Sequence, residues 1–214
     1  STQRSTLFPY TTLFRSLVGR HVFPLHRLDR STSGVLAFAL DPEMARLGQE
    51  HLTAEDACKL YLALTRGYVP DSVEIDHPLA PAEGGEAKPA LTSVRCLARI
   101  EGYSLVLARP WTGRTHQIRR HLKHLSHPLI GDVRYGKGEH NRKMRTSVGL
   151  HRLALHALHS SFRHPVTDAP LTFFAPLPAD LAEPLQRLGF GELLSELQSL
   201  RWPPRPPESP RANG

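Results

Sequence analysis

Residues 92–108 read TSVRCLARIEGYSLVLA, and this stretch decides the fold class. Apolar and polar side chains alternate through residues 92–100 and again through residues 103–108, which is the period of a β-strand. Glu101 and Gly102 separate the two runs, a spacing typical of a β-hairpin. The stretch therefore predicts two antiparallel strands in the middle of the chain.

Strand and helix patterns continue on both sides of this hairpin. Further strands are predicted over residues 35–40 (a buried one), 59–69, 153–162 and 171–174. Helical patterns cover residues 42–51, 115–125 and 177–200. Asp41 and Thr115 are placed to cap the first two helices, and Gly189 interrupts the third. Loops are expected over residues 70–90 and 131–147. Since strands outnumber helices and hairpins join them, we expect an α+β fold with a largely antiparallel or mixed sheet and flanking helices.

The run HRLDRSTSG at residues 26–34 places one carboxylate, Asp29, between Arg27 and Arg30. A nearby positive charge favours the ionised form of a carboxylate. Such a group can act as a nucleophile or stabilise positive charge, but it is a poor proton donor at neutral pH. The alternative is that Asp29 caps a surface turn and that both arginines are solvated.

Basic residues gather around a second motif, PWTGRTHQIRRHL at residues 110–122. Residues 102–152 hold eleven Lys and Arg against two acids, a local charge of +9, whereas the whole chain carries +7. A basic block on a nearly neutral domain indicates a polyanionic partner. The alternative is charge that serves solubility alone.

The two motifs resemble signature motifs of the RluA-type pseudouridine synthases. Lys59-x-Tyr61 and the run RLALHA at residues 152–157 resemble two more, and all four follow the family's order. The resemblance covers roughly residues 20–190. It is greatest to the members that modify position 65 of tRNA, because of residues 120–132 and of Asn141 with Arg142.

This resemblance implies an isomerase that flips a uridine out of the RNA and converts it to pseudouridine. It implies that Asp29 attacks C1′ of the ribose or assists loss of a C2′ proton, that Arg119 pairs with Asp29, and that Tyr61 packs against the base and helps to remove the C5 proton. Arg27 would fill the space that the base vacates, and Leu155, rather than Leu153, would line the pocket. The RNA-binding residues are then Arg27, Arg30, Thr32, Lys59, Arg114, His116, Gln117, Arg120, Lys123 and Leu155.

The resemblance implies RNA as the partner, a monomer, and chemistry without a metal or redox cofactor. The histidines at positions 116, 121, 124 and 127 could suggest zinc, but no cysteine or acid completes a ligand set. We expect His116 to make structural hydrogen bonds and the other three to face RNA or solvent. Cys58 and Cys96 are expected as buried free thiols in a reducing cytoplasm. No apolar run has the length of a membrane span.

The chain divides into three expected parts. Residues 1–16 contain two near-repeats, STLF and TTLF, and we interpret them as non-native. Residues 17–200 would form the catalytic domain, and its N-terminal strand is expected to be missing because the family's Lys-Pro-x-Gly segment is absent. Residues 201–214 are rich in proline and predicted to be disordered.

Three alternatives remain open from the sequence: a ribosomal-RNA synthase of the same family, a catalytically silent RNA-binding protein, and a fragment too damaged to fold well. The retention of Asp29, Tyr61 and Arg119 together argues against the second, because binding alone needs none of the three.

Overall fold

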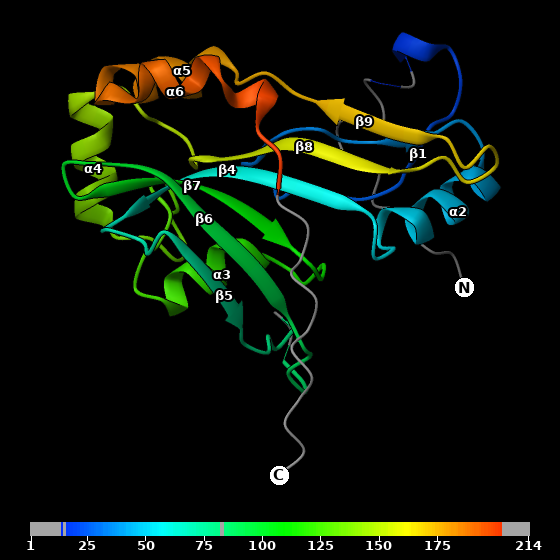
Figure 1. Cartoon of the computed structure of the whole chain (residues 1–214), viewed down its shortest axis with the longest axis horizontal. Helices are drawn as coiled ribbons and strands as arrows, with labels where there is room; N and C mark the ends of the chain where they lie inside the picture. Colours follow the sequence, from blue (N-terminus) through cyan, green and yellow to red (C-terminus); the bar gives the residue numbers. More distant parts are fainter. Residues whose placement is uncertain (1–13, 15, 82–83, 203–214) are drawn as a thin grey trace.

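One twisted sheet runs through the molecule (Figure 1). The computed structural model describes residues 14, 16–81 and 84–202. The strand order is β2-β8-β4-β7-β6-β5, and β9 also pairs with β8. All strand pairs are antiparallel except β2 with β8. The strands of this sheet are β2 (Ser33–Gly34), β4 (Cys58–Arg66), β5 (Ser72–Asp76), β6 (Leu91–Ile100), β7 (Tyr103–Pro110), β8 (Leu155–Arg163) and β9 (Pro170–Phe174). The expected α+β class is thus confirmed, and β6 and β7 form the predicted hairpin.

Helices cover the sheet in three groups, each with its own apolar cluster. α4, α5 and α6 gather at one end of the molecule and α2 lies at the other (Figure 1). α4 and α5 pack on the largest cluster, which includes Leu62, Leu105 and Leu107. α3 contributes Ile118 and Leu122 to the second cluster. The helical elements are α2 (Pro42–Leu52), α3 (Gln117–His124), α4 (Gly138–Ser147), α5 (Ala179–Leu185), η1 (Gln186–Phe190), α6 (Gly191–Ser195) and η2 (Leu197–Ser199).

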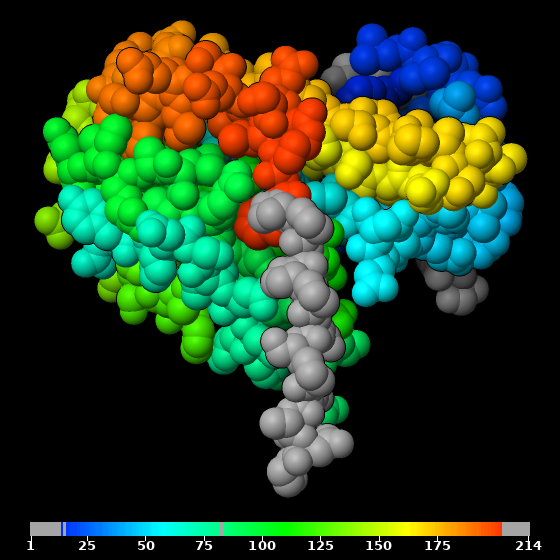
Figure 2. All heavy atoms as spheres, in the orientation of Figure 1, coloured from blue at the N-terminus to red at the C-terminus, as the bar shows by residue number. Residues whose placement is uncertain are grey.

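Two predicted helices follow the expected local chemistry. The Asp41 carboxylate accepts a hydrogen bond from the N–H of Met44 at 2.8 Å, and Pro42 opens α2. In the C-terminal helical region the backbone of Gly189 has φ 100°, so the helical path breaks there as predicted. Figure 2 shows this region as the upper surface of the molecule, beside the β8–β9 hairpin.

The apolar run at residues 35–40 does not form the predicted buried strand. Its residues are half-buried or exposed, and only Phe38–Ala39, strand β3, pairs with β1 (Phe23–Pro24). The N–H of Val35 donates to Ala157, whereas the carbonyl of Ala37 accepts from Leu25. Because these backbone groups pair with two different segments, no continuous ladder forms.

Two predicted loops contain regular structure. β5 lies in the first, where Val73 and Ile75 alternate with exposed polar residues at the edge of the sheet. α4 occupies the end of the second, and Met144 is its buried residue. A helix with so little apolar surface gives no periodic signal in the sequence.

The cap predicted for the basic helix is also wrong. α3 begins after His116, whose backbone is left-handed at φ 54°, and no side chain caps it. Cys58 and Cys96 are free thiols, half-buried rather than buried. The expectations for the two termini concern residues 1–16 and 201–214, of which residues 1–13, 15 and 203–214 lie outside the described residues. Within the described part of the chain, no helix is long and apolar enough to cross a membrane.

Candidate active site

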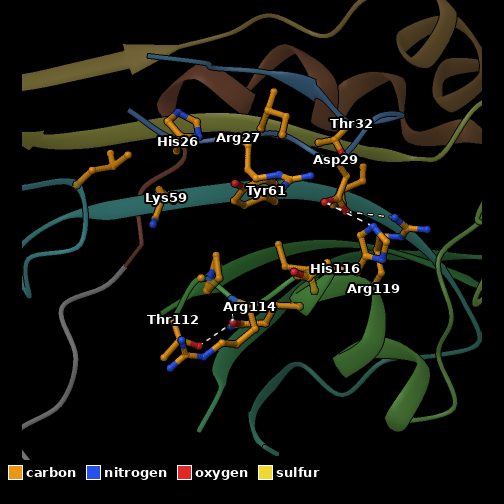
Figure 3. Close-up of a pocket in the computed structure, with 18 of the residues that line it drawn as sticks. His26, Arg27, Asp29, Thr32, Lys59, Tyr61, Thr112, Arg114, His116 and Arg119 are labelled. Carbon is orange, nitrogen blue, oxygen red and sulfur yellow. Dashed lines mark hydrogen bonds and ion pairs between the residues drawn. The ribbon is translucent and has the colours of Figure 1, made fainter. Parts of the chain in front are cut away.

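A cavity of about 380 Å³ opens between the segment before β2, strand β4 and the segment that leads into α3 (Figure 3). Residues far apart in the sequence meet on its walls. Ten of the residues proposed from the sequence line it: Arg27, Asp29, Thr32, Lys59, Tyr61, Arg114, His116, Gln117, Arg119 and Leu155. Arg30, Arg120 and Lys123 do not line it.

The loop that carries Asp29 is anchored where it enters β2. The N–H of Thr32 donates to the Asp29 carbonyl at 2.8 Å and closes a tight turn. Gly34 follows with φ 117°, and a Cβ there would lie 2.1 Å from the carbonyl oxygen of Ala157 on β8. Only glycine therefore fits at this crossing. The Thr32 hydroxyl is buried and has no hydrogen-bond partner among the described residues.

Arg119 joins the carboxylate of Asp29 to that of Asp132. Its Nη1 lies 3.2 Å from Oδ2 of Asp29, while its Nε and Nη2 lie 2.7 and 3.0 Å from Asp132. Burial alone would raise the pKa of Asp132, but the hydrogen bonds from Arg119 and from two backbone N–H groups outweigh it, and the pKa falls below its usual value. Asp132 is therefore a fixed negative charge that holds Arg119 in place.

The second oxygen of Asp29 faces a histidine. His116 Nε2 lies 3.9 Å from Oδ1 of Asp29, and His116 Nδ1 lies 3.1 Å from the hydroxyl of Tyr135. Burial lowers the pKa of His116 although Asp29 opposes this shift. The ring is thus neutral near pH 7, whereas Arg119, which contacts Asp29, is permanently charged.

Tyr61 and Leu155 form apolar walls of the cavity. Burial, assisted by the negative charge of Asp29, raises the pKa of Tyr61 to about 12, so its hydroxyl keeps its proton near neutral pH. Leu155 is buried and lines the cavity. Leu153 packs in the core cluster beneath α3 and does not line the cavity. The wall residue is therefore Leu155, the first of the two candidates.

Gln117 organises the loop that bears Arg114. Its Oε1 accepts hydrogen bonds from the Thr112 hydroxyl at 2.6 Å and from the N–H of Arg114 at 3.0 Å. Its Nε2 donates to the Leu91 carbonyl and the Thr92 hydroxyl, both at 2.9 Å. Gln117 thus ties the cavity rim to β6 rather than pointing a free amide at a ligand.

The basic side chains differ in their exposure and in whether they donate hydrogen bonds to backbone carbonyls. Arg27, Arg30 and Lys123 are exposed. Arg114 is exposed too, and its Nε donates to the carbonyl of Pro89. Arg120 is half-buried and donates to the carbonyl of Ala80 at 2.8 Å, so part of its role is structural.

The other histidines of the basic segment point in separate directions. His121 is fully buried and bonds to the Thr92 hydroxyl and the His77 carbonyl, which corrects the expectation that it faces RNA or solvent. His124 is exposed and stacks on His77, and His127 bonds to the carbonyl of Arg66. Among the described residues no group of three or more His, Cys, Asp or Glu side chains could hold a metal ion.

Sequence reasoning assigned no role to four residues that support the site. These are Ser33, Asp132, Tyr135 and His156. The sequence does contain a signal for Asp132, which is the single acid among residues 102–138. An isolated carboxylate in so basic a segment is expected to pair with an arginine.

The model of the RNA pseudouridylate synthase family matches residues 4–124, which include Asp29, Tyr61 and Arg119. The chain belongs to this family. The synthase is 44% identical to tRNA pseudouridine synthase C of Haemophilus ducreyi, over 79% of this chain and 78% of the relative. It is 38% identical to the protein of the same name from Vibrio cholerae, over 90% and 87% of the two chains.

Solved structures agree with this assignment. Human RNA pseudouridylate synthase domain containing 4 superposes on the synthase with a TM-score of 0.70 at 26% identity, over 83% of this chain and 81% of that one. Human RNA pseudouridylate synthase domain containing 1 gives a TM-score of 0.67 at 25% identity, over 89% and 85%. The resemblance inferred from the motifs, and the fold and enzyme class that it implied, are confirmed.

Proposed function

We propose that this synthase converts uridine 65 of tRNA to pseudouridine. The carboxylate of Asp29 carries the proposal, because Arg119 holds it in a cavity between Tyr61 and Leu155. The tRNA specificity rests on the name shared by the bacterial relatives. The exposed cations near the cavity suit the phosphates of an RNA.

The reaction is an intramolecular rearrangement, so uridine and pseudouridine contain the same atoms. The N1–C1′ bond of the uridine breaks, a C5–C1′ bond forms, C5 loses a proton and N1 gains one. Asp29 would either attack C1′ or assist loss of the C2′ proton. A carboxylate suits both roles, because it can donate an electron pair to carbon or accept a proton. No metal or redox cofactor enters this balance.

Tyr61 is proposed to pack against the flipped base and to relay the C5 proton. After C5–C1′ bond formation, loss of that proton restores the conjugated ring, so a weak base is sufficient. A phenol with a pKa of about 12 keeps its proton, so it would receive the C5 proton while it passes its own to solvent. Leu155 would cover the other face of the base.

Access to the base requires that the nucleotide leaves its stem. Unstacking costs a few kcal/mol, which contacts to phosphate groups must offset. Arg27 is exposed at the cavity and is proposed to fill the vacated space. Thr32 and Lys59 are proposed to contact the nucleotide inside the cavity, and Arg30, Arg114, Arg120 and Lys123 the RNA outside it. We expect a monomer to suffice and the enzyme to act in the cytoplasm, where tRNA is modified.

Tritium release from RNA labelled with [5-³H]uridine tests the proposal, with bulk tRNA and ribosomal RNA as parallel substrates. We expect release from tRNA, and none from a transcript in which position 65 is cytidine. Asp29→Ala should abolish release while the Kd for tRNA stays within about threefold, because phosphate contacts dominate RNA affinity. Release from ribosomal RNA alone would contradict the assignment of tRNA as the substrate. No release from either RNA would contradict the proposal that the protein catalyses this reaction.

A further inference from the structure

The turn formed by residues 132–136 lies beside the cavity. Oδ1 of Asp132 accepts hydrogen bonds from the backbone N–H groups of Arg134 and Tyr135, both at 2.9 Å. The N–H of Gly136 donates to the Asp132 carbonyl at 3.1 Å. An Asp side chain that bonds to N–H groups ahead of it in the sequence stabilises a tight turn.

The turn connects to Asp29 first through Arg119. Asp132 Oδ2 accepts from Nε of Arg119 at 2.7 Å and Oδ1 accepts from Nη2 at 3.0 Å, which leaves Nη1 to bind Asp29 at 3.2 Å. The Asp132 side chain is fully buried and that of Arg119 is 10% exposed. A two-bond fork of this kind fixes both the position and the plane of a guanidinium.

A second connection passes through Tyr135 and His116. A carboxylate only accepts hydrogen bonds, so the His116 nitrogen that faces Asp29, Nε2, is favoured as the N–H. Nδ1 then has a free lone pair, and the Tyr135 hydroxyl, 3.1 Å away, is placed to donate to it. In that tautomer the Nε2 proton points at Asp29 while the Tyr135 hydroxyl donates to the opposite nitrogen.

We propose that the 132–136 turn is a positioning element for the reaction: Asp132 orients Arg119, which binds one oxygen of Asp29, and Tyr135 orients His116, which faces the other. This inference rests on the proposed function of Asp29. Such precision matters because a displacement of about 1 Å in an active site can cost on the order of 100-fold in rate.

Asp132→Asn separates the two tasks of Asp132. The amide oxygen can stay in the Oδ1 position and keep the two backbone bonds of the turn, while the NH₂ group replaces Oδ2 and faces Nε of Arg119. We expect kcat to fall by about tenfold or more, with the Kd for tRNA within about threefold of wild type. Asp56→Asn is the matched control, because it changes an exposed carboxylate paired with Arg163.

Tyr135→Phe keeps the ring over Arg119, whose Cζ is 5.1 Å from its centroid, and removes only the hydroxyl. Two-bond ¹H–¹⁵N NMR spectra report the tautomer of His116 without any turnover. We expect the Nε2–H form in wild type and a mixture in Tyr135→Phe, together with a fall in kcat of about threefold or more. Tyr68→Phe, which alters an exposed tyrosine, is the matched control.

The result that supports positioning is a loss in kcat for both variants, without a matching loss in tRNA affinity, and a changed His116 tautomer in Tyr135→Phe. A drop in melting temperature alone, with kcat at the level of the two controls, would overturn it. Inactivity of the wild-type protein would instead count against the proposed function, while the tautomer measurement would still decide whether Tyr135 orients His116.

Discussion

The hydroxyl of Ser33 lies 2.8 Å from Nδ1 of His156, and this contact joins the loop that carries Asp29 to strand β8. The other ring nitrogen of His156 lies 2.9 Å from the carbonyl of Ala175 and must donate to it. Burial lowers the pKa of His156, so the ring is neutral and accepts at Nδ1. The Ser33 hydroxyl thus donates to His156 while it accepts from Arg152 at 2.7 Å.

Replacement of Ser33 by Ala leaves a buried acceptor on His156 and a donor on Arg152 without this partner. We expect the free energy of unfolding to fall by about 1–3 kcal/mol, which is the usual cost of an unsatisfied buried group. We also expect kcat to fall, because the loop that carries Asp29 loses an anchor. Chemical denaturation and tritium release measure the two effects. Ser147→Ala, at an exposed helix end, is the control, and equal effects in both variants would contradict the anchoring role.

Gly34→Ala tests the close crossing of β2 and β8. The new Cβ would overlap the Ala157 carbonyl, and φ 117° is unfavourable for alanine. Strain and overpacking together should lower the free energy of unfolding by about 2–4 kcal/mol. Gly113→Ala is the control, since no heavy atom lies within 4 Å of its new Cβ. A Gly34→Ala protein as stable as this control would show that β2 and β8 can separate freely.

His26 should make the fold sensitive to acid. Burial, assisted by Lys59, lowers its pKa from 6.5 to about 4, and its Nε2 accepts from the N–H of Ala37. Because the pKa of His26 is lowered in the folded protein, the unfolded chain binds the proton more readily. The contribution of His26 to the free energy of unfolding is therefore fully present above pH 6.5 and is lost as the pH falls toward 4. Between pH 7.5 and pH 5.0 the loss from this group is about 2 kcal/mol.

The His26→Gln variant keeps an acceptor for Ala37 but does not titrate. Its free energy of unfolding should therefore change less between the two pH values than that of wild type, by about the same 2 kcal/mol. Exposed His151→Gln serves as the control. Identical pH dependence in wild type and His26→Gln would refute the assignment.

Tyr61→Phe should separate base packing from proton relay. The phenylalanine ring retains the apolar wall, so the Kd for tRNA should stay within about threefold, while loss of the hydroxyl should slow tritium release by about 100-fold or more. Comparison of kcat with tRNA affinity in the same preparation measures both. An unchanged kcat would show that C5 loses its proton without help from Tyr61.

Substitution of the exposed Lys123 and of Arg120, which is bonded to the backbone, should have different effects. Lys123→Ala removes an exposed charge and should reduce the slope of tRNA affinity against salt concentration by about one, with little change in melting temperature. Arg120→Ala also breaks the bond to the Ala80 carbonyl and should lower the melting temperature as well. A titration of tRNA binding at several salt concentrations, with a thermal melt of each variant, distinguishes the two.

Elements with strong periodicity or clear caps could be predicted from the sequence, as the β6–β7 hairpin and α2 show. β5 and α4 were missed because each buries only one side chain fully, so their formation depends on tertiary contacts. The same division holds at the site. The motifs carry the cavity residues, whereas the pairing of Arg119 with Asp132 depends on how a loop folds back on a helix. No spacing rule for the sequence contains that information.

The parallel pairing of β2 with β8 also dictates an order of assembly. Asp29 and Arg119 are 90 residues apart in the chain, and Ser33 and His156 are 123 residues apart. A chain still on the ribosome and ending before Leu155 would already contain Asp29, Tyr61 and Arg119, but it would lack the strand against which Gly34 crosses. Long-range contacts of this kind form slowly, because closing a long loop costs conformational entropy before the contacts repay it. The pocket is thus completed only after strand β8 has been made, although its catalytic motifs all precede that strand in the chain.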